Sequence, residues 1–404
     1  MNEKSLNMAD FAYNLSNEKI ALKPLEKRND SQLLVYNCHT EKISDKTFKD
    51  LPDLLPQNSI MIINDSKVIY ARLLFKNKNN ATIEIFCIEP VFPSSEIASI
   101  LQSKDKCTWK CMVGNLKKWK EEELKISSEK FELTVRRSET KSENGILIEF
   151  TWDGNVTFGE VLLVAGNVPL PPYIKRSAEA DDKISYQTVY ANREGSVAAP
   201  TAGLHFTNEE LEKIQQKNIA ICRLDLNVSA GTFLPVKTDN ALEHKMHEEK
   251  FYIEKSFVEQ LIRNSGKFIC VGTTSMRAIE SLYWIGCKMT IKNDLTINNL
   301  DQWEYNELEE SSELSLKSSF EKILSSFEYQ NKSVIEFVTS IMITPGYEFK
   351  VTDILITNFH QPKSTLLLLI SAFTKGNWKK IYEHALNNNY RFLSYGDSSV
   401  LFKS

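Results

Sequence analysis

Two segments of the sequence share a pattern in which a short apolar run gives way to a polar loop and then to a helix. Phe268–Val271 is followed by the loop 272–275 and by helical periodicity from Met276. Residues 354–357 are followed in the same way by the loop 358–364. Apolar strands that alternate with helices of 3.6-residue periodicity are typical of α/β proteins. The pattern therefore predicts an α/β main domain built on a mixed sheet.

A third segment, 198–206, ends just before Thr207-x-x-Glu210, which has the spacing of a helix capping box. In open α/β sheets, ligands bind at the carboxyl ends of strands. Each loop alone is better explained as a turn with a helix cap, but three such loops with basic or imidazole side chains favour a shared site. In the loop 272–275, free backbone N–H groups, three hydroxyl groups and Arg277 can converge on a carboxylate or a phosphate.

The region 67–163 differs from its surroundings, because its apolar segments are short, rich in β-branched and aromatic residues, and separated by polar turns. It predicts a small all-β, barrel-like domain inserted into the α/β domain, whose two halves would be 1–66 and 164–404. The stretch 301–333 is rich in Glu, Ser and Lys. It predicts a solvated helical excursion, with disorder as the alternative.

The composition is that of a water-soluble, folded protein. Hydrophobic residues make up 42% and charged residues 25% of the 404 residues, close to the averages for globular domains. The longest strongly apolar stretch, 366–373, is far shorter than the roughly 20 residues of a membrane span, so no membrane contact is expected. The seven cysteines are odd in number and most lie in apolar surroundings, which predicts a reducing, cytoplasmic location.

Several motifs that would define a site are missing. There is no glycine-rich dinucleotide or P-loop motif and no G-x-S-x-G motif, so the pocket must be built from other loops. His244 and His247 could lie on one helical face, but they lack the glutamate of H-E-x-x-H. Cys107 and Cys111 have no second pair nearby, and no metal site is expected.

Three neighbouring motifs are the most distinctive part of the sequence: PLPPYI at 169–174, YQTVYA at 186–191 and GSVAAPTAGLHFT at 195–207. They resemble the signature of the S-adenosylmethionine:tRNA ribosyltransferase-isomerase family of queuosine biosynthesis. Further segments match in the family's order: Arg28, 64–68, 71–73, AGTFLPV at 230–236, MHEE at 246–249, 272–277, PGY at 345–347, 357–365 and YRFLSYGD at 390–397. The resemblance covers nearly the whole chain and is weakest in the β domain and at 285–335.

Five places depart from the family pattern. They are Asn227, where a histidine is usual, Ser229 in place of glycine, Gln361 in place of leucine, Gln32 in place of arginine, and the segment 398–402. These changes indicate a divergent branch of the family and leave the predicted fold unchanged.

The resemblance implies that the ribosyl group of S-adenosylmethionine is transferred and isomerised onto the aminomethyl group of a 7-deazaguanine in the tRNA anticodon loop, with release of adenine and methionine. The sulfonium acidifies the ribose C5′ protons, so a base is needed near that carbon, and a proton donor helps adenine to leave. The catalytic candidates are His205, His247, His360 and Asp397; for each, a hydrogen-bonded structural role is the alternative. S-adenosylmethionine is a substrate here, so no cofactor is expected.

The same resemblance implies a binding site for S-adenosylmethionine made from Thr201, Gly203, Thr273, Thr274, Ser275, Arg277 and Asn358. The guanidinium of Arg277 is expected to pair with the methionine carboxylate, an RNA phosphate being the alternative. His205 and Asp397 are expected to work in one site, with Asp397 orienting the imidazole directly or through the substrate.

The implied macromolecular partner is the tRNA anticodon stem-loop. Candidate contacts are Tyr173, Lys175, Arg176 and Arg193, because unpaired bases stack on aromatic rings and phosphates attract basic side chains. Lysines of the β domain at 110, 117, 118 and 120 are further candidates, or else part of a solvated face. The protein is expected to be a monomer.

Two other classes of function stay open. One is a non-catalytic RNA-binding paralogue, suggested by Asn227 and Gln32; the other is an S-adenosylmethionine- or nucleoside-processing enzyme that acts on a small molecule. Release of adenine separates the three, since a binding module releases none and a small-molecule enzyme releases it without tRNA.

Overall fold

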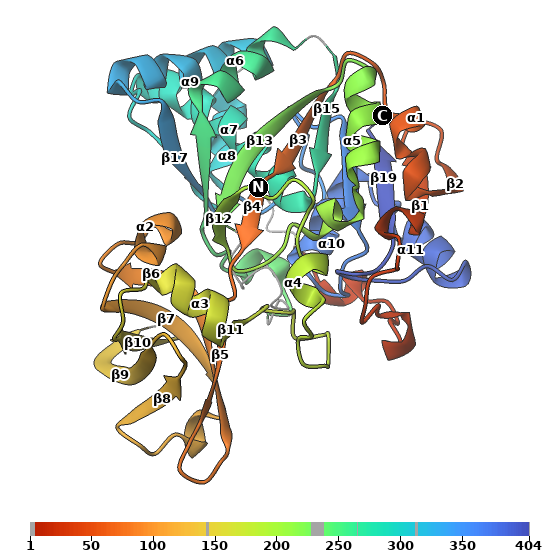
Figure 1. The fold of residues 1–404 in the computed structure, drawn as a ribbon. Helices are drawn as coiled ribbons and strands as arrows, with labels where there is room; N and C mark the ends of the chain where they lie inside the picture. The colour runs from red at the N-terminus through yellow and green to blue at the C-terminus, as the bar shows by residue number, and fades with distance from the viewer. Residues whose placement is uncertain (1–4, 143–144, 228–237, 265, 312–313, 404) are drawn as a thin grey trace.

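The computed structural model describes residues 5–142, 145–227, 238–264, 266–311 and 314–403. Ten strands of this described part form one large mixed sheet (Figure 1). In order across the sheet they are β16 (Asn299–Leu300), β17 (Val334–Thr339), β14 (Glu249–Glu254), β13 (Ala220–Asn227), β3 (Ile60–Asn64), β15 (Phe268–Val271), β18 (Ile354–Asn358), β19 (Ser398–Phe402), β1 (Gln32–Asn37) and β2 (Lys42–Thr47). The four central strands β13, β3, β15 and β18 are parallel, so their carboxyl ends lie at the same edge.

Helices cover both faces of this sheet. They are α1 (Leu51–Leu54), α5 (Asn208–Gln216), α6 (Lys255–Arg263), α7 (Thr273–Lys292), α8 (Glu304–Ser311), α9 (Leu316–Gln330), α10 (Thr365–Phe373) and α11 (Trp378–Asn387). A further short helix, α4 (Asp182–Ser185), has no residue in the hydrophobic cores on these two faces. In β3, Ile60 and Ile62 join the core that contains α6, α7, α9, α10 and α11, whereas Met61 and Ile63 join the core that contains α1 and α5. A strand that is buried on both faces has to be apolar throughout, as β3 is. No helix of the described residues is long and apolar enough to cross a membrane.

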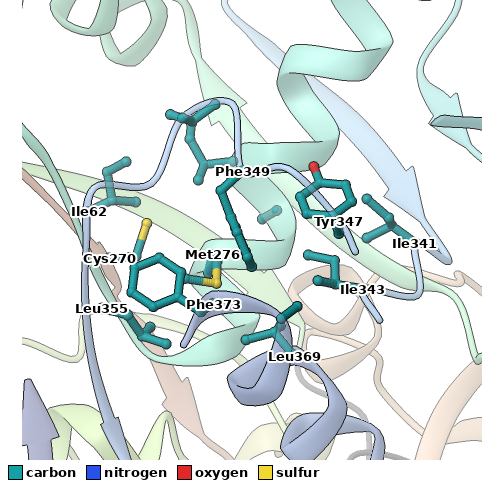
Figure 2. Packing of buried hydrophobic residues seen from close by; sticks show 14 of the residues in the cluster. Ile62, Cys270, Met276, Ile341, Ile343, Tyr347, Phe349, Leu355, Leu369 and Phe373 are labelled. Atoms are coloured by element: carbon teal, nitrogen blue, oxygen red, sulfur yellow. The ribbon is translucent and has the colours of Figure 1, made fainter. Parts of the chain in front are cut away.

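The larger core joins the parallel strands to two helices (Figure 2). Ile62, Cys270 and Leu355 come from the neighbouring strands β3, β15 and β18, and all three are buried. Met276 of α7 and Phe373 of α10 pack beside them. The start of α7 is thereby held over the carboxyl ends of the strands, where the polar loops lie.

A second, antiparallel sheet stands apart from the large sheet (Figure 1). Its strands are, in order, β11 (Gly166–Asn167), β5 (Arg72–Lys76), β6 (Thr82–Phe92), β7 (Lys106–Gly114), β10 (Gly145–Trp152), β9 (Glu132–Ser142) and β8 (Glu123–Ser127). The sheet curls so that β5 contacts β8, and α2 (Ile97–Leu101) and α3 (Phe158–Ala165) pack against its core. The short parallel pair β4 (Ser66–Val68) and β12 (Arg193–Ser196) lies between the two sheets.

The predicted fold class is confirmed: a mixed α/β sheet is accompanied by a separate curled β sheet. The domain boundaries at 66/67 and 163/164 stay a prediction. The description of 301–333 as a solvated excursion is wrong for α9, because Phe320 and Phe327 are buried in the main core. Helix α9 crosses α7 closely, since a Cβ at Gly286 would lie 2.2 Å from Ser319 Oγ. Charged residues occupy only its outer face.

Candidate active site

The polar loops after β15 and β18 meet the short helix η6 (Thr201–His205) at an open pocket. The pocket is lined by residues of all three polar loops, 199–202, 272–274 and 357–361, together with Tyr173 and Ser394. Six of the residues predicted from the sequence are in this lining: Tyr173, Thr201, Thr273, Thr274, Asn358 and His360. The structure therefore brings three segments that are far apart in the chain into one site.

The first turn of α7 presents backbone N–H groups at this pocket. Gly272 makes the turn from β15 into the helix with φ of 89°, a conformation that side-chain-bearing residues rarely adopt. Its N–H donates to the Ile356 carbonyl at 2.8 Å, which fixes the turn to β18. Thr273 and Thr274 follow and line the pocket. The first N–H groups of a helix have no acceptor within it and favour an anion.

Two of the predicted S-adenosylmethionine-binding residues lie behind the wall rather than in it. Ser275 is fully buried in α7. Gly203 allows close packing, because a Cβ at this position would lie 2.0 Å from Tyr190 Oη. Both residues therefore shape the loops without facing the pocket.

His205 is buried behind Asn358. Asn358 Nδ2 donates to His205 Nε2 at 3.2 Å and to the Leu393 carbonyl at 3.2 Å. The other ring nitrogen, Nδ1, lies 2.8 Å from Ser31 Oγ, so this arrangement requires the proton on Nδ1. Burial lowers the pKa of His205 to about 3, and Arg391 adds to this effect. His205 is therefore neutral near pH 7 and orients the Asn358 amide.

Asp397 is buried, and its carboxylate accepts hydrogen bonds from backbone N–H groups and not from His205. Its Oδ1 accepts from the Gln32 backbone N–H at 3.1 Å, and its Oδ2 accepts from the Arg391 backbone N–H at 2.7 Å. Arg391 Nη2 also donates to Oδ1 at 3.2 Å. No direct contact between Asp397 and His205 is present among the described residues, and the expected contact through the substrate stays a prediction. The bond from Gln32 uses its backbone, so the change from arginine leaves this contact possible.

His360 is the one predicted catalytic imidazole in the described lining of the pocket. Its Nε2 lies 3.0 Å from Thr357 Oγ1, and its backbone N–H donates to Tyr382 Oη at 3.0 Å. Its carbonyl accepts from Tyr13 Oη. Burial lowers the pKa of His360 to about 4, so the ring is neutral near pH 7 and is held by backbone contacts on both sides.

Arg277 is not among the described residues that line the pocket, and its predicted role in binding a carboxylate of the substrate stays a prediction. Its Nη1 lies 2.6 Å from Glu249 Oε2, and its Nε and Nη2 donate to the Ile341 carbonyl at 3.2 and 3.0 Å. Burial acts to raise the pKa of Glu249, but Arg277 and His247 together hold it below its usual value. His247 Nε2 lies 3.4 Å from Glu249 Oε1. The guanidinium of Arg277 is therefore already paired with a buried carboxylate of the protein itself.

The predicted tRNA-binding side chains differ in whether a carboxylate of the protein already pairs with them. Arg176 Nη1 and Nη2 lie 2.6 and 2.8 Å from the two carboxylate oxygens of Asp182, an arrangement that occupies the guanidinium internally. Arg193 pairs with Glu254. Lys175 is exposed. Among Lys175, Arg176 and Arg193, Lys175 therefore retains the exposed charge that a phosphate contact needs, and the two arginines each have a carboxylate partner.

Three side chains at the site had no role assigned from the sequence. Ser394 Oγ lies 2.6 Å from Tyr173 Oη at the pocket wall, and it belongs to the motif at 390–397. Glu249 belongs to the motif at 246–249. Ser31 holds His205 but lies outside every motif, so no sequence signal identified it.

The positions that depart from the family pattern lie in different environments. Gln361 lines the pocket. Asn227 ends β13 with its Oδ1 2.7 Å from where a Cβ at Gly195 would stand. Ser229 lies outside the described residues. Within the described part of the chain, no three His, Cys, Asp or Glu side chains are grouped so that they could hold a metal ion.

Comparison with known proteins identifies the family of this chain. The sequence model of the family described as queuosine biosynthesis protein matches residues 8–401. An S-adenosylmethionine:tRNA ribosyltransferase-isomerase of Sulfurihydrogenibium is 35% identical over 401 residues, covering 98% of this chain and 100% of the relative. The protein of that name from Treponema denticola is 36% identical, covering 97% and 99%. A Thermotoga maritima crystal structure, described as S-adenosylmethionine tRNA ribosyltransferase, has a TM-score of 0.45 and 25% identity over 97% of this chain and 100% of its own. The chain belongs to the queuosine biosynthesis protein family.

Proposed function

We propose that this protein is an S-adenosylmethionine:tRNA ribosyltransferase-isomerase. It transfers and isomerises the ribosyl group of S-adenosylmethionine onto 7-aminomethyl-7-deazaguanine in a tRNA anticodon loop, giving epoxyqueuosine-tRNA with release of adenine and methionine. The observation that carries the proposal is the full-length similarity to relatives of that name, together with one pocket built from three family motifs.

The pocket suits S-adenosylmethionine in its chemistry, because its lining combines hydroxyl, amide, imidazole and apolar side chains. The methionine carboxylate would be bound by the N–H groups at Thr273 and Thr274, at the positive end of α7. Asn358 would form the adjoining wall, with its amide held by His205. In this arrangement His205 and Asp397 are positioning residues.

Two imidazoles remain as candidates for proton transfer. His360 lines the pocket, and His247 lies beyond the sheet edge in the loop that leads into β14. Deprotonation at C5′ needs a neutral imidazole, and a second group can protonate the departing adenine. The tRNA anticodon stem-loop would approach Tyr173 at the pocket wall and the exposed Lys175.

The test is release of adenine and methionine from S-adenosylmethionine with tRNA that carries the 7-aminomethyl-7-deazaguanine base. We expect release that depends on this tRNA, and a loss of at least about 10²-fold in turnover for His360→Ala. His39→Ala is the matched control, since His39 is exposed and lies outside the pocket. No release by the unmodified protein would favour the non-catalytic RNA-binding paralogue. Release without tRNA would favour an enzyme that acts on a small molecule.

A further inference from the structure

A buried ion pair stands behind His247. The side chains of Arg277 and Glu249 are 3% and 1% exposed, and their charged atoms are 2.6 Å apart. A buried ion pair is often no more stabilising than well-packed apolar side chains, because both charges lose their hydration. Stability alone therefore does not explain why this pair lies beside a histidine.

The pair leaves one carboxylate oxygen for His247. Arg277 is held by two bonds to the Ile341 carbonyl, so the position of its guanidinium is fixed. Arg277 Nη1 bonds Glu249 Oε2. Oε1 of Glu249 and Nε2 of His247 lie 3.4 Å apart, and neither atom has a hydrogen-bond partner among the described residues. Both atoms are buried.

The position of the carboxylate favours one nitrogen of His247 as the carrier of the proton. A carboxylate is negatively charged and can only accept a hydrogen bond, so a hydrogen is favoured on Nε2, the nitrogen 3.4 Å from it. In the neutral ring, the lone pair is then on Nδ1. The His247 side chain is 29% exposed, and because Nε2 is buried, the exposed part of the ring belongs to its other atoms. The lone pair on Nδ1 thus lies on the side of the ring away from the ion pair.

His247 and the pocket are connected through α7. Thr273 and Thr274 line the pocket, and Arg277 follows Thr273 on the same helix after about one turn, or roughly 6 Å along the axis. Glu249 begins β14, which pairs antiparallel with β13, so it lies at the edge where β13 and the other parallel strands end. The ion pair therefore joins the start of the pocket helix to the loop that carries His247.

We infer that Glu249 and Arg277 are positioning residues that make His247 Nδ1 the proton acceptor of the reaction. This inference rests on the proposed function. The C5′–H bond of S-adenosylmethionine breaks, its electron pair stays on C5′ beside the sulfonium, and the proton forms a new bond to Nδ1. The imidazolium that results is stabilised by the Glu249 carboxylate, as in other carboxylate–imidazole pairs. Arg277 keeps the carboxylate ionised and in place.

The experiment compares Glu249→Gln with the unmodified protein in the adenine-release assay. We expect kcat to fall by about 10²-fold or more, with KM for S-adenosylmethionine changed less than about threefold. His247→Ala should lose at least as much, and Glu249→Gln should then cost little further in the His247→Ala background. Glu280→Gln is the matched control: Glu280 is also buried on α7 and is bound by backbone N–H groups of 350–352. It should lower stability and leave kcat unchanged.

A second measurement does not depend on activity. The ¹⁵N spectrum of the labelled histidines in the unmodified protein should show His247 with its proton on Nε2, identified by the signal lost in His247→Ala. A proton on Nδ1, full turnover by His247→Ala, or an unchanged kcat in Glu249→Gln would each overturn the inference while leaving the proposed function standing. Absence of adenine release by the unmodified protein would overturn the proposed function itself. If Glu249→Gln fails to fold, the half-exposed His247 still gives the test through His247→Ala.

Discussion

The exchange Asp397→Asn should destabilise the fold by about 2–3 kcal/mol. The carboxylate accepts from the backbone N–H groups of Gln32 and Arg391 at 3.1 and 2.7 Å, and from Arg391 Nη2 at 3.2 Å. Asp397 is only 1% exposed, so water cannot replace a lost bond. These contacts tie the start of β1 to the segment that leads into β19.

The magnitude follows from the geometry of the asparagine amide. Hydrogen bonds to a charged group contribute about 1.5–3 kcal/mol each. Whichever way the amide turns, its NH₂ group faces one of the two backbone donors, so at least one such bond is lost and the others lose their charge assistance. The ion pair with Arg391 contributes less, because that side chain is 29% exposed and water screens it.

Urea unfolding, followed by circular dichroism, measures the loss. Asp30→Asn is the matched control: its ion pair with Lys49 has an N–O distance of 3.4 Å and both side chains are about half exposed, so little change is expected. At a temperature where every variant is folded, adenine release by Asp397→Asn should stay within about tenfold of the parent. An unchanged free energy of unfolding with abolished release would refute this reasoning, because Asp397 would then act in the chemistry.

Three further predictions concern pH, packing and RNA. Burial lowers the pKa of His205 from 6.5 to about 3. The stability that neutral His205 contributes is therefore fully present above pH 6.5 and is lost as the pH falls toward 3, and the loss reaches about 2 kcal/mol at pH 5. In His205→Gln, the fall in urea midpoint between pH 7 and pH 5 should be smaller; an equal fall would contradict the assignment. Gly203→Ala places a Cβ 2.0 Å from Tyr190 Oη, so calorimetry should show a loss of about 1–3 kcal/mol in the free energy of unfolding. An unchanged unfolding temperature would show that the loop moves to make room for the methyl group. Lys175→Ala should weaken tRNA binding and reduce the salt slope by about one, whereas an unchanged slope would remove Lys175 from the interface.

The fold was predictable from the sequence where polarity changes abruptly along the chain. The run Phe268–Val271 and the loop after it identify a strand and its carboxyl end without any knowledge of its neighbours. The packing of α9 was not predictable in this way, because charged and hydroxyl side chains dominate its composition. Its contact with α7 depends on Gly286 lying opposite Ser319, and that is a long-range pairing between two separate helices.

The site was predictable at the level of loops, and less so for individual charged side chains. Arg277 and Arg176 were expected to meet a ligand, but each meets a carboxylate of the chain, Glu249 and Asp182. A sequence motif can show that an arginine lies near the sheet edge where the site is built. It does not show whether the guanidinium is already paired, since Glu249 is 28 positions away from Arg277 and the contact arises only from the sheet topology.

The described lining of the pocket consists of hydroxyl, amide, imidazole, aromatic and aliphatic groups, and no Asp, Glu, Lys or Arg belongs to it. The charged residues near the site are paired behind its walls, as Asp397 is with Arg391. If S-adenosylmethionine binds here as proposed, its sulfonium meets no carboxylate within this lining. When the C5′ proton is lost, the positive sulfonium and the negative carbon beside it have no net charge together. A pocket wall without a carboxylate favours this product over the positively charged S-adenosylmethionine from which it forms. A carboxylate in the lining would instead stabilise the cation and oppose the deprotonation, so keeping the charges one layer back serves the proposed reaction.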